Sequence, residues 1–260
     1  MFQFPFEISP ETKVSDIVKR DYRTADVFRR YGISYCCGGN WPVAVACKMT
    51  AVDPSELIDA LKASVRNLRL PGQTDFQSWE TVFLVDYIVN VHHHYLKISL
   101  PLIRPMLADF VTEHAKKFNY LHDLLEQFDY LLAQLNALME TEEQVLFPYI
   151  RQLAHAHRHP EPYGALFIRS FRKPAAEMMT AGIGLISSLL TGIRLITKQY
   201  ITPENACVSH IVVISKLREL DVDLEHHFHL EQSVLYPKII QLEKDLLGLR
   251  GPDISVPGNT

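Results

Sequence analysis

Residues 142–148 read Glu-Glu-Gln-Val-Leu-Phe-Pro, and residues 231–237 read Glu-Gln-Ser-Val-Leu-Tyr-Pro. Both runs follow the pattern Glu-x-x-Val-Leu-aromatic-Pro, and each lies in a long stretch with the periodicity of an α-helix. A repeat carried by two helices indicates two structurally equivalent places. We therefore expect Glu142 and Glu231 to point inward from their helices, one or two turns before a bend at the closing proline.

The two runs belong to a set of four long segments in which apolar residues recur at helical spacing. The segments cover residues 78–117, 119–154, 174–200 and 203–247. Four helices of this length predict an all-α protein whose main domain is a four-helix bundle. Pro101 and Pro105 should kink the first helix, and residues 158–172 form the one long connection.

A small helical domain is predicted ahead of the bundle. Its amphipathic segments cover residues 14–20, 24–31 and 55–68. Asp53 and Pro54 are typical of a helix start, Tyr31-Gly32 is typical of a helix end, and Cys36-Cys37-Gly38-Gly39 follows as a loop. We predict this helical domain at residues 1–70, a linker at 71–78, the bundle at 79–248 and a flexible tail at 249–260.

The composition is that of a packed globular protein, with 47% hydrophobic residues and only 11 glycines in 260 residues. A net charge of −4 and the lack of a long Lys/Arg run give no reason to expect nucleic acid or an anionic membrane as partner. Residues 1–12 lack the pattern of a signal peptide, so we expect a cytoplasmic protein with free thiols. The apolar residues 178–193 are too few to span a bilayer and predict a buried helix.

Histidines accompany the two glutamates. A carboxylate in a helical core is costly unless it is paired or binds a cation. His227 lies four residues before Glu231, so the two share a helical face and can bind a transition metal together. The first long helix adds His93 and His114, which are 21 residues apart. One site can hold both only if the helix breaks near its two prolines. We interpret His92 and His94 as surface residues or residues behind the ligands.

Taken together, these motifs resemble the Repair of Iron Centres family, over nearly the whole chain. The specific marks are Tyr35-Cys36-Cys37-Gly38-Gly39, the run at residues 142–148, and His227-x-x-x-Glu231 followed by Val-Leu-Tyr-Pro. The resemblance implies a hemerythrin-like bundle in a cytoplasmic, often dimeric protein that helps to restore iron–sulfur clusters after nitrosative or oxidative damage. It also implies two irons held by five histidines and two bridging glutamates.

Residue by residue, the resemblance assigns metal-ligand roles to five positions: His93, His114, Glu142, His227 and Glu231. Leu138 and Gly182 stand where two further histidines are expected. These replacements predict a reduced site of non-haem iron, as one ion or two, or of another transition metal. The alternative is a metal-free network of paired His⁺ and Glu⁻. The spacing does not select His122 or His210 as substitutes.

The leading functional hypothesis is an iron-binding stress-response protein that repairs iron–sulfur clusters, acts on damaged iron–sulfur proteins as clients and forms a homodimer. Cys36 and Cys37 then carry out redox chemistry or deliver iron or sulfur, unless they are structural thiols. A second hypothesis is a degenerate hemerythrin-like protein that acts as a binding or regulatory partner. A third, an O₂ or NO carrier or sensor, needs a di-iron pair and is weakened most by the missing histidines. The sequence shows no nucleophile–base triad, phosphate loop or dinucleotide fingerprint, so nothing supports a hydrolase, a kinase or a dehydrogenase. Whether the protein is an enzyme of another kind stays open.

Overall fold

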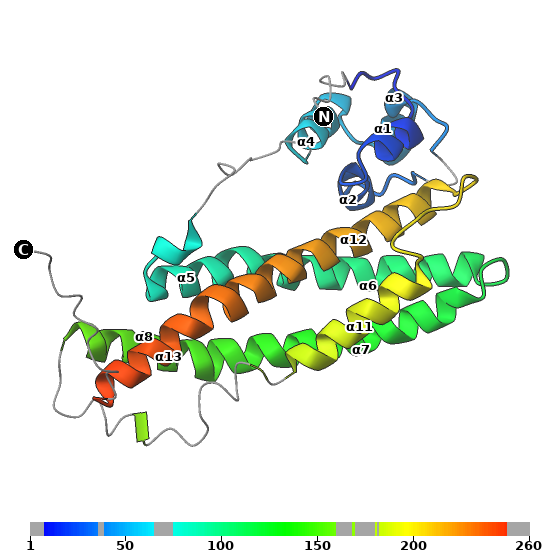
Figure 1. Ribbon diagram of the computed structural model, residues 1–260. Coiled ribbons are helices and arrows are strands. Elements are labelled where there is room, and N and C mark those ends of the chain that lie inside the picture. The colour runs from blue at the N-terminus through cyan, green and yellow to red at the C-terminus, as the bar shows by residue number, and fades with distance from the viewer. Residues whose placement is uncertain are drawn as a thin grey trace, which may run out of the picture. The chain divides into compact units, whose positions relative to one another are not determined.

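The computed structural model describes residues 8–35, 39–64, 75–159, 168–169, 180 and 182–248 (Figure 1). The named elements of these residues are all helices, and one isolated backbone bridge joins Lys13 to Pro42. Short helices come first, and long helical runs follow and form a bundle. The predicted all-α fold with a four-helix bundle is confirmed.

The N-terminal region contains α1 (Val14–Arg20), α2 (Thr24–Arg30), α3 (Val43–Thr50) and α4 (Pro54–Ser64). Asp53 caps α4 as predicted, because its Oδ1 accepts the backbone N–H of Ser55 at 2.7 Å. Gly32, with φ of +68°, ends α2. Helix α3 was not predicted. It lacks a side-chain cap, and its first N–H groups instead donate to the carbonyls of Thr12 and Pro10 at 2.9 and 2.8 Å.

Three of the four long runs share an unusual construction, in which a π-helical turn separates two α-helices. The first run is α5 (Thr81–Tyr87), η2 (Ile88–His93) and α6 (His94–His114), and the 3₁₀ turn η1 (Phe76–Ser78) precedes it. The second is α7 (Tyr120–Thr141), η3 (Glu142–Leu146) and α8 (Phe147–Arg158). The third is the single helix α11 (Ile183–Ile196), and the fourth is α12 (Val208–His229), η4 (Leu230–Leu235) and α13 (Tyr236–Leu246).

The prolines of the repeated motif account for two of the π turns. Pro148 and Pro237 each stand second in the helix that follows η3 or η4. A proline has no N–H to donate and its ring crowds the carbonyl four residues earlier, so a wider turn ahead of it relieves the clash. The carbonyl left free by Pro237 belongs to Ser233, and it accepts a hydrogen bond from Gln77 Nε2 at 3.1 Å.

Lys238 on α13 binds the same segment of chain as Ser233 does. Its Nζ donates to the carbonyl oxygens of Gln77 and Trp79 at 2.8 and 3.0 Å. The segment that leads into α5 is therefore tied to the turn that carries Glu231.

The chain divides into two compact units. One comprises residues 1–73, 101–126 and 193–220, and the other comprises residues 74–100, 127–192 and 221–260. The first unit therefore combines the N-terminal helices with one part of each long run, and Lys216 Nζ binds Asp26 Oδ2 there at 2.6 Å. The domain limits expected from the sequence, with a linker at residues 71–78, stay a prediction.

Gly39 offers a test of the N-terminal packing. A Cβ atom at this position would lie 2.1 Å from the backbone oxygen of Tyr35, which cannot move without shifting the chain. We expect Gly39→Ala to destabilise the protein by about 1–3 kcal/mol in urea unfolding. Gly184→Ala is the matched control, because nothing lies within 4 Å of its Cβ position in helix α11, and it should be neutral or slightly stabilising. Equal losses in both variants would contradict this account.

Candidate metal centre

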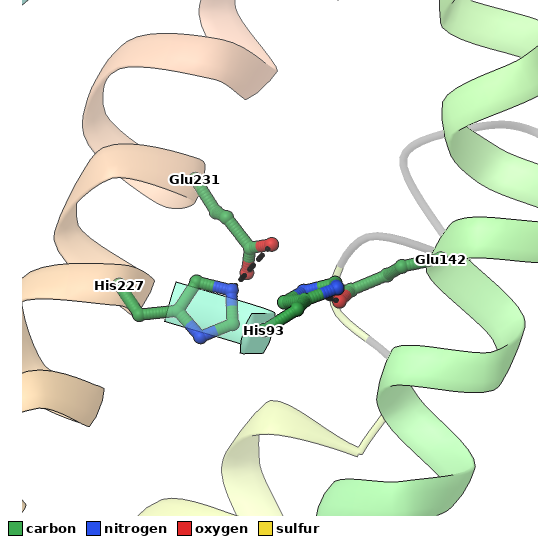
Figure 2. Close-up of side chains that lie close together, drawn as sticks. All are labelled: His93, Glu142, His227 and Glu231. Carbon is green, nitrogen blue, oxygen red and sulfur yellow. Dashed lines mark hydrogen bonds and ion pairs between the residues drawn. The ribbon is translucent and has the colours of Figure 1, made fainter. Parts of the chain in front are cut away.

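Four of the predicted ligand residues meet in the second unit. His93 is the last residue of η2, Glu142 the first of η3 and Glu231 the second of η4, while His227 lies one turn earlier on α12. One ligand atom from each lies within 4.8 Å of all the others, and Figure 2 shows the four side chains converging from three helical runs. Three of the four sit in π turns, which occur often at functional sites.

The cluster is almost completely shielded from solvent. The side chains of His93, His227 and Glu231 are 0% exposed, and that of Glu142 is 2% exposed. Two carboxylates and two imidazoles are therefore held together in an apolar core, where an unbalanced charge costs several kcal/mol.

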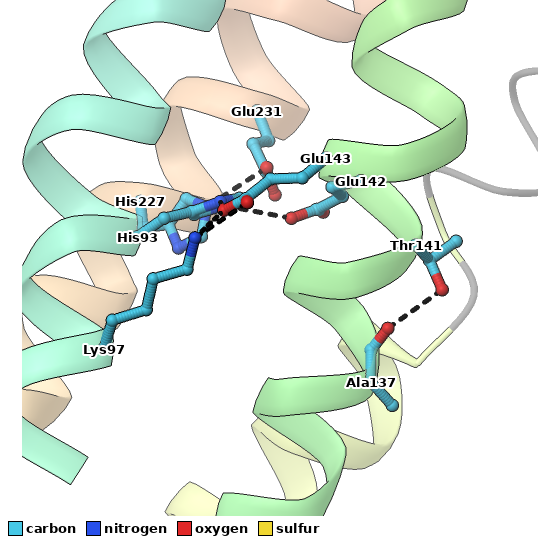
Figure 3. A network of polar contacts seen from close by, with 8 residues as sticks. All are labelled: His93, Lys97, Ala137, Thr141, Glu142, Glu143, His227 and Glu231. Atoms are coloured by element: carbon cyan, nitrogen blue, oxygen red, sulfur yellow. Dashed lines mark hydrogen bonds and ion pairs between the residues drawn. The ribbon is translucent and has the colours of Figure 1, made fainter. Parts of the chain in front are cut away.

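Glu143 sets the orientation of His93. Nδ1 of His93 donates to Glu143 Oε1 at 2.8 Å, and Lys97 Nζ binds the same carboxylate at 2.7 Å (Figure 3). With its proton on Nδ1, His93 directs the Nε2 lone pair toward Glu142, whose Oε2 is 3.2 Å away. A carboxylate behind the imidazole is the usual arrangement of a metal-binding histidine.

The remaining polar atoms of the cluster are poorly paired. His227 Nε2 and Glu231 Oε1 are 3.1 Å apart. Apart from the 3.2 Å approach of His93 Nε2 to Glu142 Oε2, three buried atoms have no hydrogen-bond partner within the described part of the chain: Glu142 Oε1, His227 Nδ1 and Glu231 Oε2. Each such atom costs about 1–3 kcal/mol if it stays unpaired, so the cluster is arranged for a partner that a proton or a cation can supply.

Burial also changes the acidity of these groups. It raises the pKa of Glu142 to about 7, with a further contribution from the charge of Glu231, and it raises the pKa of Glu231 to about 7. Burial lowers the pKa of His227 to about 3. For His93 burial acts against protonation, but the neighbouring carboxylates of Glu142, Glu143 and Glu231 together raise its pKa. In the metal-free protein the two glutamates are thus inclined to hold protons near neutral pH.

The four donors fit a transition-metal ion. First-row metals such as zinc bind imidazole nitrogen and carboxylate oxygen at about 2.0–2.2 Å, so ligands on opposite sides of an ion are roughly 4 Å apart. The four ligand atoms lie within 4.8 Å of one another, so the side chains need to move only slightly closer together to bind one ion. Mixed imidazole and carboxylate donors suit iron, zinc and manganese.

His114 does not join this cluster. The sequence required a break near Pro101 and Pro105, but α6 is described along its whole length and runs unbroken from His94 to His114. His114 therefore ends the helix that His93 precedes. Its Nε2 lies 3.6 Å from Cys207 Sγ in the first unit.

The other positions from the sequence fall as follows. Leu138 is buried, one turn before Glu142. Gly182 is exposed with φ of +87° and precedes α11, so it lies in a turn and not within the third helix. His122 is exposed, and the buried His210 is hydrogen-bonded to the hydroxyl of Tyr120 at 3.1 Å. Cys36 and Cys37 lie outside the described residues.

Two features of the site go beyond the sequence interpretation. His92, taken as a surface residue or a residue behind the ligands, is 2% exposed and pairs with Asp223. Lys97 holds Glu143 behind His93. The burial of His92 could have been inferred from Asp223, which lies four residues before His227 and therefore shares its helical face.

Removing both buried carboxylates should stabilise the metal-free protein. An acid whose pKa rises on folding from 4.5 to about 7 favours the folded state when protonated, so that contribution is lost as pH rises between these values. Glu142→Gln/Glu231→Gln, unfolded by urea with a chelator present, should exceed the wild type by about 1–4 kcal/mol at pH 8, with a smaller gain at pH 5. A gain that is the same at both pH values would contradict the assignment.

The chain matches two family models. Residues 10–65 match the ScdA_N domain, a domain of unknown function (DUF542), and residues 84–239 match the hemerythrin HHE cation binding domain. No helix in the described part of the chain is long and apolar enough to cross a membrane.

Relatives cover most of the chain. The iron-sulfur cluster repair protein ScdA of Staphylococcus haemolyticus is 26% identical over 89% of this chain and 99% of its own length. The iron-sulfur cluster repair proteins YtfE of Salmonella typhimurium and Yersinia pestis are 27% and 25% identical, over 84% and 85% of this chain and 91% and 93% of their own lengths. The chain therefore belongs to the hemerythrin HHE cation-binding family and, with its ScdA_N domain, to the Repair of Iron Centres proteins that its sequence resembles.

Proposed function

We propose that this protein binds non-haem iron at His93, Glu142, His227 and Glu231 and takes part in the repair of iron–sulfur clusters after nitrosative or oxidative damage. The observation that carries the proposal is the buried four-residue cluster, whose donors converge without full hydrogen-bond pairing among the described residues. Relatives that align with 89% and 84% of this chain are named iron-sulfur cluster repair proteins, which supports the assignment of the process.

In this proposal some residues bind the iron and others orient the residues that bind it. Iron, when bound, supplies redox change and affinity for small ligands such as O₂ and NO. Glu142 and Glu231 balance the charge of the ion, and His93 and His227 contribute neutral nitrogen donors. Glu143 fixes the tautomer of His93, and Lys97 holds Glu143 in place.

The cluster supports one ion in preference to two. Four donors lie close together, whereas Leu138 offers no lone pair and Gly182 lies in an exposed turn. Further parts of the proposal follow from the family: a cytoplasmic location, a homodimer, damaged iron–sulfur proteins as clients, and a redox or delivery role for Cys36 and Cys37.

Metal analysis tests the proposal directly. Protein purified without oxygen and supplied with Fe(II) should retain close to one iron per chain, and Glu142→Gln/Glu231→Gln should lose it while staying folded by circular dichroism. The iron-loaded wild type should also restore the activity of an NO-damaged [4Fe–4S] enzyme faster than the double variant does. If the wild type retains no iron or other transition metal, the proposal is wrong, and the second hypothesis of a degenerate hemerythrin-like binding or regulatory partner is favoured.

A single substitution tests why one ion is preferred. Leu138→His places an imidazole four residues before Glu142, as His227 stands before Glu231, so it should raise the iron content per chain above that of the wild type. Leu138→Asn is the control for adding a polar group at the same buried place. Equal iron contents in all three proteins would show that Leu138 does not limit the number of ions.

A further inference from the structure

We propose that His92 is an additional metal ligand of the buried centre, oriented by Asp223, and that it compensates for one of the histidines missing at Leu138 and Gly182. This inference rests on the proposed metal binding. It concerns a residue to which the family resemblance assigns no ligand role.

His92 is prepared for a ligand in the same way as its neighbour His93. Its Nδ1 donates to Asp223 Oδ1 at 2.9 Å, as Nδ1 of His93 donates to Glu143 at 2.8 Å. Both imidazoles are buried, with 2% and 0% of the side chain exposed, and both rest on carboxylates that are partly exposed. Nε2 of His93 lies 3.2 Å from Glu142 Oε2, whereas Nε2 of His92 is buried without a hydrogen-bond partner among the described residues.

The place of His92 connects it to the cluster. Its ring lies parallel to the ring of His227, with an angle of 8° between the planes and 5.3 Å between the centroids. Asp223, His227 and Glu231 follow one another at intervals of four residues, so they share one face of α12 and η4. His92 thus packs against the helical face that supplies two of the four clustered residues.

Neither protonation state of His92 satisfies the free nitrogen. A neutral ring with its proton on Nδ1 leaves a buried acceptor at Nε2, and a protonated ring leaves a buried N–H donor there. Either atom costs about 1–3 kcal/mol without a partner. The other rings packed against His92 are those of His226 and Tyr87, with centroids 5.1 and 5.7 Å away, and Nε2 of His92 has no hydrogen bond to either in the described structure. A metal ion bound at Nε2 removes this cost.

Binding requires a limited movement. Nε2 of His92 is not one of the four atoms that lie within 4.8 Å of one another, so the imidazole must turn toward the cluster when the ion binds. His92 and His93 are the last two residues of the π turn η2, and both are buried there. The turn therefore directs two successive imidazoles into the same core.

The experiment uses Co(II) as the probe with the full chain, because cobalt reports coordination number and ligand type in its spectra. Wild type, His92→Gln, Asp223→Asn and His94→Gln are titrated with Co(II). His94 is the matched control, since it is the adjacent histidine and is exposed. We expect Co(II) affinity to fall by about 10–100-fold in His92→Gln and by about 10-fold or more in Asp223→Asn, with no change in His94→Gln.

Paramagnetic proton NMR of the cobalt-loaded protein gives a second measurement, whose result for the wild type is informative without any variant. Each bound imidazole should show one strongly shifted, exchangeable N–H signal. The wild type should therefore show three such signals, from His92, His93 and His227, and His92→Gln should show two. This count decides the matter even if His92→Gln fails to fold.

The outcomes separate the two proposals. If the wild type binds Co(II) with only two imidazole signals and His92→Gln binds it equally tightly, His92 is not a ligand, while the four-residue site stands. If the wild type binds neither Co(II) nor Fe(II), the proposed function fails and this inference fails with it.

Discussion

Glu142 and Glu231 lie together in a core with almost no access to water. Two carboxyl groups can be kept there only if they take up protons or if a cation balances their negative charge. The surroundings of the pair follow from this constraint. His93 and His227 lie against the carboxylates. At the edge of the core, Glu143 binds His93 from behind, and Asp223 binds the neighbouring His92. Without a metal ion, the carboxylate of Glu143 at the edge of the core is the more readily ionised, and the buried Glu142 and Glu231 are the more readily protonated.

Local patterns in the sequence were sufficient to predict the bundle and to mark Glu142, His227 and Glu231, and the family resemblance added His93 as a ligand. The repeated motif marked two equivalent carboxylates, and the spacing of His227 and Glu231 placed them on one face. Whether the four residues bind metal stays a prediction. His114 shows where local reasoning stopped. A shared site for His93 and His114 required the helix to break at its two prolines, but α6 continues past both. Ile103 and Leu107, which lie next to the prolines, are buried in the core, and Pro101 lies on the exposed side of the helix. Tertiary packing outweighed the local cost of the prolines.

The π turns explain a second limit. A periodicity of 3.6 residues describes an α-helix, and each π turn departs from it for one turn. His92 and His93 occupy adjacent positions in such a turn and are both buried, which a plain helical wheel does not predict. The same departure occurs at Glu142 and Glu231. The residues that matter most for chemistry are thus the ones for which regular helical geometry is the poorest guide.

The hydrogen bonds of Gln77 and Lys238 give the cluster a mechanical connection. Gln77 donates to the carbonyl that Pro237 leaves free, and Lys238 donates to the carbonyl of Gln77 within the 3₁₀ turn and to that of Trp79 directly after it. The segment that enters α5 is consequently held to the turn that presents Glu231, so these hydrogen bonds help to fix the position of a carboxylate of the buried cluster.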